Sequence, residues 1–320
     1  MNRYDLTRRD FNLTRRDFNS LVAAGLSAGV MGGVVPELRA DDAEGFQLRY
    51  IVASCMYGTA PLAEIVPEVP KCGAKHIEIW AEPHGNQREQ FEEMGVEAFR
   101  ALLDEHGVSL GSFTCFKYGI FGMQGEMKLV AELGGDVAIC NSGGPKGLAG
   151  DELKSEVHKF ADKLKPHVEY AEEVGVTLGL ENHSGSLINS PESQLMLLDL
   201  IPSPHLGIAL APYHLPQEEA LIAKLIHDLG DRLAHIQAWE HGMGCMTKLP
   251  KEQELMQLPH RGPLDWTPIL AALKETRYSG RVEIFMHPVP RGIPILETTE
   301  QVTAEINAAR GYLEECLEGA

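Results

Sequence analysis

Short apolar or β-branched runs alternate with longer amphipathic segments from Phe46 onward, and the alternation can be counted eight times. In the segment 151–174, apolar residues recur at steps of three or four, which marks one face of a helix. The segment 302–316 repeats this helical spacing, and Gly175 stands where the earlier helix would end. The predicted strands are 48–54, 76–80, 108–115, 136–141, 176–182, 206–210, 233–238 and 282–286.

Strands that alternate with helices form parallel sheets joined by right-handed helical crossovers. Eight such units in about 270 residues are what closure into a (β/α)8 barrel requires. An open, doubly wound sheet is the alternative, but no G-x-G-x-x-G motif opens the first helix. We therefore predict an α/β fold, a single (β/α)8 TIM barrel over residues 46–318. The one long irregular segment, 239–264, would overhang the face that carries the active site in such barrels.

Residues 1–40 have a different character and predict an export signal. The sequence LTRRDFN occurs twice in succession, at 6–12 and 13–19, and each copy contains the Thr-Arg-Arg-x-Phe of a twin-arginine signal. A weakly apolar run at 21–35 follows, which is too short to cross a bilayer as a stable helix. We predict cleavage after Ala40, export through the twin-arginine pathway to the periplasm or beyond, and no stable membrane anchor in the mature chain.

The charge balance excludes one class of function. Without residues 1–40, which carry six Lys/Arg and four Asp/Glu, the formal net charge changes from −18 to −20. Nucleic-acid binding depends mainly on neutralising phosphates with basic side chains, so a nucleic-acid partner is not expected. The six cysteines are scattered without metal-finger spacing, and nothing in their positions requires disulfides.

Polar residues gather at the carboxyl ends of the predicted strands, the edge at which barrel enzymes carry their active sites. In LGLENHSG, at 178–185, an apolar run stops at Glu181 and His183, which share one face of an extended strand. A strand-end carboxylate is costly to bury without a partner, which favours a functional role for Glu181. The other polar residues at these ends and in the following loops are Glu78, Glu82, Asn141, His214, His235, Gln237, Glu283 and His287.

This mixture of carboxylate, imidazole and amide groups can hold a divalent ion such as Mn²⁺, Mg²⁺ or Zn²⁺. Such a site suits proton transfer next to the carbonyl of a sugar, because a metal or fixed donors must stabilise the enediolate. We predict that Glu181 and Glu283 are the carboxylates that exchange the proton. For Glu283 an ion pair with Arg281 is the alternative.

Several histidines and loop cations are candidates for binding the substrate. Any one of these histidines alone would more often be a hydrogen-bonded core residue, and single surface charges are usually only solvated. Their convergence at the predicted strand ends and rim loops favours contact with an anionic or polyhydroxyl ligand. The candidate substrate-binding residues are His183, His235, Lys248, His260, Arg261, His287 and Arg291.

These motifs resemble the xylose-isomerase-like TIM barrels, a family that includes sugar isomerases and epimerases, over roughly residues 48–317. LGLENH at 178–183 resembles the family's strand whose Glu binds the metal, and GIALAPYH at 207–214 resembles the next strand. LAHIQ at 233–237, GPLDW at 262–266 and YSGRVEIF at 278–285 are similar to the family's later segments. The resemblance implies a TIM barrel with carbohydrate chemistry.

The resemblance also implies metal ligands, of which Glu181 keeps its place. The family's metal-binding Asp falls on Ala211, its His falls on Gln237, and its final Glu falls on Phe285. Glu283 and His287 lie two residues on either side of Phe285, on the same face of the strand. From the polar residues retained around the lost ligands we hypothesise a relocated metal site made of Glu181, His214 and Gln237, with either Glu283 or His287.

Two functions follow from these observations. The first is a sugar isomerase or epimerase, or a related lyase, that abstracts a proton next to a carbonyl. The alternative is a non-catalytic sugar-binding barrel that has lost the family's metal site. Both take a small-molecule carbohydrate as partner, and the sequence leaves a homo-oligomer open.

Overall fold

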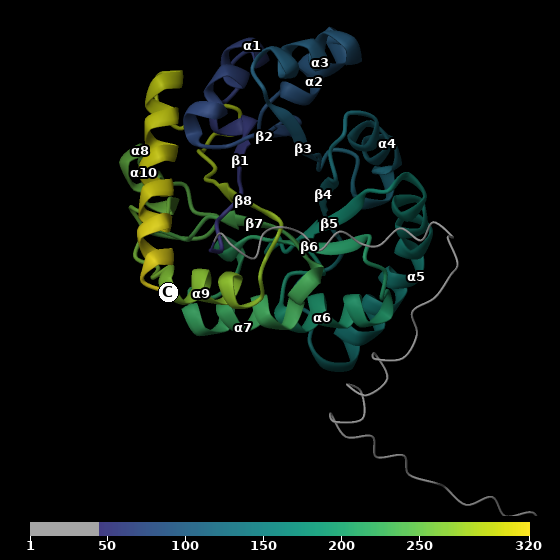
Figure 1. Cartoon of the computed structure of the whole chain (residues 1–320). Coiled ribbons are helices and arrows are strands. Elements are labelled where there is room, and N and C mark those ends of the chain that lie inside the picture. Colours follow the sequence, from purple (N-terminus) through teal and green to yellow (C-terminus); the bar gives the residue numbers. More distant parts are fainter. Residues whose placement is uncertain (1–44) are drawn as a thin grey trace, which may run out of the picture. The chain divides into compact units, whose positions relative to one another are not determined.

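Eight parallel strands close into a barrel in the order of the sequence, with β8 paired to β1. The computed structural model describes residues 45–320, and residues 46–320 form one compact unit. Each predicted strand is present, which confirms the (β/α)8 barrel (Figure 1). The strands are β1 (Tyr50–Ala53), β2 (His76–Trp80), β3 (Ser109–Thr114), β4 (Val137–Asn141), β5 (Thr177–Glu181), β6 (Leu206–Leu210), β7 (Leu233–Ala238) and β8 (Arg281–Ile284).

Helices surround the ring of strands (Figure 1). The predicted helix 151–174 is α5, whose predicted apolar face is buried and which ends where Gly175 adopts a left-handed φ of 74°. A capping box formed by Thr298 and Gln301 starts α10. The helices are α1 (Leu62–Ile65), α2 (Gln87–Met94), α3 (Val96–Glu105), α4 (Gln124–Glu132), α5 (Gly150–Val174), α6 (Pro191–Leu200), α7 (Glu219–Leu229), α8 (Lys251–Glu254), α9 (Thr267–Glu275) and α10 (Thr299–Glu318).

The inside of the barrel has an apolar side and a polar side. Val137 and Ile139 of β4 pack with Ala209 of β6 in a small cluster of their own. Gly179 of β5 allows this close packing, since a Cβ there would lie 3.2 Å from Val137 and 3.3 Å from Ile139. Opposite them, β2, β7 and β8 contribute fully buried carboxylates and an imidazole. At this depth of the barrel, polar side chains are therefore concentrated on one side of the interior.

The segment 239–264, predicted to be irregular, contains only two short helical turns, α8 and the 3₁₀ turn Leu255–Gln257. Its first residues are anchored by hydrogen bonds. The Glu240 carboxylate accepts the Leu264 amide at 2.8 Å and the Trp266 indole at 3.2 Å. Trp239 donates its indole N–H to Gln257 at 2.7 Å. The loop is thus held against the start of α9 by buried polar contacts.

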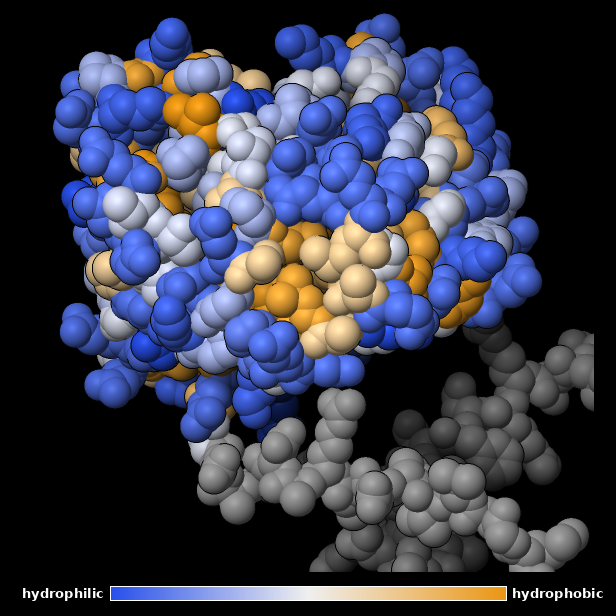
Figure 2. All heavy atoms as spheres, turned by 90° about the horizontal axis from the view of Figure 1, so that it is seen from above, coloured by the Kyte–Doolittle hydropathy of each residue, from blue (hydrophilic) through white to orange (hydrophobic). Residues whose placement is uncertain are grey.

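The predicted twin-arginine signal, residues 1–40, lies outside the described residues. Within residues 45–320, no helix is both long and apolar enough to span a membrane. All six cysteines are free. Figure 2 shows one face of the molecule, where hydrophilic side chains predominate and apolar ones gather near the lower centre of the view.

Candidate functional site

Glu181, His183 and His214 come together at the carboxyl ends of β5 and β6, and we call them the rim triad. One ligand atom from each lies within 4.8 Å of the others. Asn182 brings the two strand ends into place, because its side chain accepts the Ala211 amide at 2.7 Å and donates to the Ala211 carbonyl at 3.1 Å. The 3₁₀ turn Pro212–His214 follows directly, so His214 is placed beside Glu181.

The free atoms of the rim triad fit a metal ion. His214 Nε2 lies 3.4 Å from Glu181 Oε1, and both side chains are almost completely buried. Neither ring nitrogen of His214 has a hydrogen-bond partner. A buried imidazole without partners is unfavourable, and a cation bound by the imidazole and the carboxylate would satisfy both. Imidazole and carboxylate together suit ions such as Zn²⁺ or Mn²⁺.

His183 has a more exposed and different environment. Its ring centroid lies 4.4 Å from that of His214, and it is only partly buried. Its Nδ1 accepts the Gly185 amide at 3.0 Å, so in the neutral ring the proton is on Nε2. Burial, and then the neighbouring His214, lower the pKa of His183. His183 is therefore a neutral hydrogen-bond donor at neutral pH.

Aromatic and imidazole rings cluster beside the rim triad. His84 and His287 stack with centroids 4.4 Å apart, and we call them the histidine pair. Burial lowers the pKa of His84 to about 3, with Arg291 and His183 adding to the effect, and lowers the pKa of His287 well below its usual value. Both rings are therefore neutral at physiological pH. Trp239 makes T-shaped ring contacts with both His214 and His287, at centroid distances of 5.2 and 5.5 Å.

Arg291 is the cation of this neighbourhood. Burial lowers its pKa, and the Glu181 carboxylate acts against that effect. The charge of Arg291 also contributes to the lowered pKa values of His183, His84 and His287. The charge of one half-buried guanidinium therefore acts on a carboxylate and three neutral imidazoles.

A second group of the same residue types lies deeper in the barrel. Glu78, His235 and Glu283, which we call the interior triad, also have ligand atoms within 4.8 Å of one another. His235 Nε2 lies 3.5 Å from Glu78 Oε2 and 3.4 Å from Glu283 Oε2. Burial, and next the Glu283 carboxylate, raise the pKa of Glu78 well above its usual value. Burial also raises the pKa of Glu283 to about 7.

Two aromatic rings separate the interior triad from the rim. Trp80 and Phe285 lie two residues beyond Glu78 and Glu283, on the same faces of their strands and one layer higher. Their rings stack at a centroid distance of 5.0 Å, and both side chains are fully buried. Trp80 also donates its indole N–H to Glu283 at 3.4 Å. The interior triad is thus closed toward the carboxyl-end face.

The other predicted site residues have different surroundings. Gln237 donates its amide to Glu283 Oε2 at 3.0 Å, so it lies with the interior triad. Lys248 is exposed on the loop after β7. His260 lies 2.9 Å from Glu305 of α10, and Arg261 donates to the same carboxylate, at 2.9 Å from its Nη2. Substrate-binding roles for Lys248, His260 and Arg261 stay predictions, and the rim triad is built without them.

The two alternatives for Glu283 can now be compared. Arg281 forms a two-point ion pair with Asp136, including Arg281 Nη2 to Asp136 Oδ2 at 2.9 Å, and does not pair with Glu283. Glu283 instead accepts from Trp80 and Gln237 and lies beside His235. Its predicted role as the second proton-transfer group stays a prediction, and it would require the rings above it to move.

Sequence reasoning missed part of the site. His84 follows β2 by four residues and was not among the predicted site residues, Trp80 was predicted only as the last residue of a strand, and Trp239 only as the first residue of the irregular segment 239–264. The signal available for all three was their position at or just beyond a strand's carboxyl end. Ring residues at that edge can line a site or fill the core, and the pattern alone does not separate the two.

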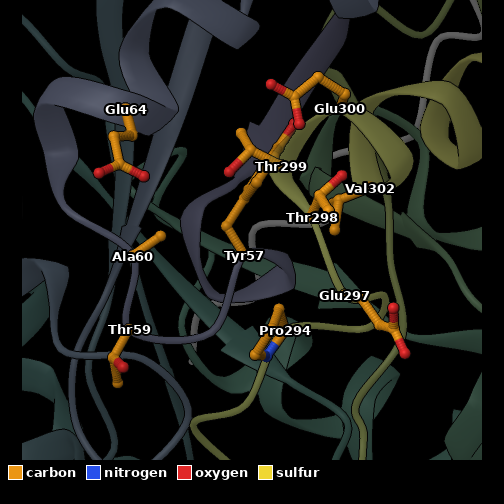
Figure 3. A pocket seen from close by; sticks show the side chains of 10 residues that line it. All are labelled: Tyr57, Thr59, Ala60, Glu64, Pro294, Glu297, Thr298, Thr299, Glu300 and Val302. Atoms are coloured by element: carbon orange, nitrogen blue, oxygen red, sulfur yellow. The ribbon is translucent and has the colours of Figure 1, made fainter.

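A separate hollow of about 480 Å³ lies between the β1–α1 loop and the start of α10 (Figure 3). Its carboxylates are Glu64, Glu297 and Glu300, and Tyr57 forms part of its wall. No member of the rim or interior triad lines it. The acidic hollow is therefore distinct from the residues that carry the candidate chemistry.

A closed (β/α)8 barrel with carboxylates and imidazoles at the carboxyl ends of its strands is the architecture of the TIM-barrel enzymes. Residues 66–307 match the family model of the xylose isomerase-like TIM barrels, and the chain belongs to that family. The relationship predicted from the strand motifs is thereby confirmed.

The proteins to which this chain is similar include sugar epimerases. The chain is 33% identical over 113 residues to a D-psicose 3-epimerase of Enterocloster bolteae, a match that spans 34% of this chain and only 33% of that protein. Its fold is similar to a D-psicose 3-epimerase from Clostridium cellulolyticum H10 solved with D-tagatose, with a TM-score of 0.65 and 18% identity over 84% of this chain and 99% of that one. It is also similar to the IolI protein with a bound zinc atom, with a TM-score of 0.67 and 16% identity over 85% and 99% of the two chains.

Proposed function

We propose that this protein is a carbohydrate isomerase or epimerase that moves a proton next to a carbonyl, in a pocket built on the rim triad. One observation carries the proposal. The Glu181 carboxylate lies 3.4 Å from the His214 ring at the carboxyl ends of the strands, both side chains are buried, and neither nitrogen of that ring makes a hydrogen bond. A keto-hexose is the substrate class we favour, since relatives include D-psicose 3-epimerases.

Substrate binding would use rings and donors rather than many charges. The partly exposed His84 ring, stacked on His287, provides an apolar edge against which the C–H groups of a sugar can pack. His183 Nε2 and the Arg291 guanidinium provide hydrogen-bond donors for hydroxyl and carbonyl oxygens. This combination of few polar groups on an apolar wall is typical of small-molecule sites.

Proton transfer would centre on Glu181. One of its oxygens, Oε1, faces His214, which leaves the second oxygen to accept a proton from the carbon next to the carbonyl. The C–H electron pair forms the C=C bond of an enediolate, and the carbonyl π pair moves onto oxygen. Neutral His84 and His287 can donate N–H groups to that oxygen, and Arg291 can offset its charge. The hydroxyl on the deprotonated carbon then passes its proton to the oxyanion, and Glu181 returns its proton to the neighbouring carbon as the new carbonyl forms, which completes an isomerisation.

Epimerisation would need a second proton donor on the opposite face of the substrate. Glu283 was predicted for this role, but it is fully buried behind Trp80 and Phe285. Glu181 is the one carboxylate of the rim triad, which favours one-base isomerisation over two-base epimerisation. Glu181 and His214, with His183 beside them, would hold a divalent ion, which when bound polarises the carbonyl and stabilises the enediolate.

Deuterium wash-in from D₂O tests this proposal. The purified protein, supplied with Mn²⁺ or Zn²⁺ and a panel of keto-hexoses, should introduce deuterium next to the carbonyl, and Glu181→Gln should lose this exchange. Glu297→Gln, at an exposed carboxylate of the acidic hollow, is the matched control and should exchange normally. Exchange that persists at the wild-type rate in Glu181→Gln would rule out Glu181 as the proton-transfer group.

A non-catalytic sugar-binding barrel is the second candidate. It is favoured by Ala211 and Phe285, which stand where the resemblance places two metal ligands, and by the closed position of the interior carboxylates. In this case keto-hexoses would raise the melting temperature without any deuterium exchange. The same panel of sugars, measured by thermal shift, therefore separates the two functions.

We also propose that the protein is exported through the twin-arginine pathway. The support is the repeated Thr-Arg-Arg-x-Phe at 7–11 and 14–18, followed by the weakly apolar run at 21–35. Replacing all four arginines, Arg8, Arg9, Arg15 and Arg16, by lysine should leave the full-length protein in the cytoplasmic fraction, whereas the wild type is exported and shortened. Export that continues in the lysine variant would contradict the proposal.

A further inference from the structure

The interior triad has the geometry of a second metal site, separate from the rim triad. Its two measured edges, 3.5 Å and 3.4 Å, join His235 Nε2 to Glu78 Oε2 and to Glu283 Oε2. Ligands bonded to one tetrahedral ion at about 2.0–2.1 Å stand about 3.3 Å apart. These two edges therefore match those of a common tetrahedral ion to within about 0.2 Å, and the third lies within 4.8 Å.

Polar atoms without partners surround the triad. Glu78 Oε2 is buried and accepts no hydrogen bond, although the other oxygen of that carboxylate accepts one from Thr114. Gln237 Oε1 and Ser112 Oγ are also buried and lack partners. Strand register places Gln237 beside Glu283 and Ser112 beside Glu78. These oxygens offer a cation additional ligands on the two sides of the triad.

The charge of the triad has no other compensation. In the part of the chain that the structure describes, the only basic side chain within ion-pair distance of Glu78 or Glu283 is His235. His235 is almost completely buried, and its Nε2 lies within 3.5 Å of both carboxylates, where an imidazole nitrogen can serve as a third ligand to a shared metal ion. Two carboxylates enclosed without a cation are unfavourable unless a proton or a metal ion neutralises them.

We infer that Glu78, His235 and Glu283 bind a divalent transition-metal ion of the Zn²⁺ or Mn²⁺ type inside the barrel, as a closed structural site. One imidazole and several oxygen ligands suit these ions better than Ca²⁺. Trp80 and Phe285 close the route to the rim, so the ion enters while the chain folds and exchanges slowly afterwards. This inference does not depend on the proposed enzymatic function.

Metal counting on four refolded proteins tests the inference. The wild type, His214→Ala, Glu78→Gln and Thr114→Val are refolded with Zn²⁺ or Mn²⁺, desalted, and analysed by elemental mass spectrometry. The wild type should hold two ions per chain, and His214→Ala should lose the rim ion but keep the interior one. Glu78→Gln should lose the interior ion, while Thr114→Val, which removes a hydroxyl donor but no ligand, should keep it.

A chelator added to the folded wild type gives a second measurement that needs no variant. The rim ion should be removed quickly and the interior ion only as fast as the protein unfolds, with a lower melting temperature after refolding without metal. If Glu78→Gln binds as many ions as the wild type, or refolding without metal leaves the melting temperature unchanged, the carboxyls share a proton and the inference is wrong. Failure of the enzymatic proposal would be seen separately, as unchanged deuterium exchange in Glu181→Gln.

Discussion

The rim triad and the interior triad contain the same kinds of residue but have different surroundings. The rim triad lies at the face where substrates bind in barrels of this type. Its member His183 is partly exposed, as are the nearby His84 and Arg291. The interior triad is covered by Trp80 and Phe285 and is bound into a network with Gln237 and Thr114.

Height along the barrel axis therefore decides what each triad can do. A metal site that takes part in a reaction keeps an open position, whereas a structural site is closed by protein. Two residues along a strand separate Glu283 from Phe285 and change the environment from closed interior to rim. The residue types alone would assign both triads the same role.

The largest expected effect is on kcat, and it should distinguish a variant of the rim triad from a variant of the interior triad. Removing the proton-transfer carboxylate in Glu181→Gln should lower kcat by about 10²- to 10⁴-fold, the range found for general acid–base groups. The melting temperature should change little, because Gln keeps the shape of the side chain. Glu78→Gln should show the opposite pattern, with a lowered melting temperature and a much smaller change in kcat. Steady-state kinetics and thermal unfolding on the same preparations measure both, and equal losses of kcat would contradict the division of roles.

Trp80→Ala would remove one of the two stacked rings that separate the interior triad from the rim triad. The Trp80 side chain is fully buried and stacks on Phe285, so its loss should lower the free energy of unfolding by about 3–5 kcal/mol, as for other buried aromatic residues. Denaturant unfolding measures this change. In the folded variant, a chelator should also remove the interior ion faster than from the wild type. A normal exchange rate in Trp80→Ala would mean that another route or barrier controls access.

An effect of intermediate size is expected at Glu240, where the free energy of unfolding should depend on pH. Burial raises the pKa of Glu240 to about 7, against the opposing hydrogen bonds from Leu264 and Trp266. The folded state therefore binds a proton that the unfolded state releases near pH 4.5. Its contribution to stability is fully present below pH 4.5 and is lost as pH rises through 7. The change corresponds to at most about 3 kcal/mol.

The matched variant for this effect is Glu240→Gln, whose side chain does not titrate. Denaturant unfolding at pH 5 and pH 8 should show a fall in stability for the wild type and a smaller fall for Glu240→Gln. Identical pH dependence in the two proteins would mean that Glu240 is ionised in the folded state, with its two donors outweighing burial.

The fold was predictable from sequence because each step used local information. Helix periodicity in 151–174, the glycine that ends it, and the eight apolar runs are properties of short segments, and all are present in the structure. Glu181, His183 and His214 could be selected because each follows an apolar strand run. The rule that strand ends meet at one edge then brings them together without further information.

The division into two triads was not predictable in the same way. Glu283 and His235 were correctly placed on strands, but their depth depends on the stagger of neighbouring strands and on the rings stacked above them. Arg261 and Arg291 were both predicted as loop cations that bind substrate. Nothing in the local sequence shows that Arg261 forms an ion pair with Glu305, or that Arg291 interacts electrostatically with Glu181. Contacts between distant segments decide such cases, and a single sequence does not specify them.

The smallest expected effect distinguishes these two arginines. In Arg261→Ala, Glu305 keeps its contact with His260 at 2.9 Å, and the lost ion pair is partly exposed at Arg261, so the free energy of unfolding should fall by less than about 1 kcal/mol. The KM for sugar should not change, because that guanidinium is already engaged by α10. Arg291→Ala is the matched comparison and should raise KM by about 10-fold or more, the loss expected for a charged hydrogen bond to substrate. If Arg261→Ala raises KM as much as Arg291→Ala does, the loop after β7 rearranges to reach the substrate, and the rim site must be extended to include it.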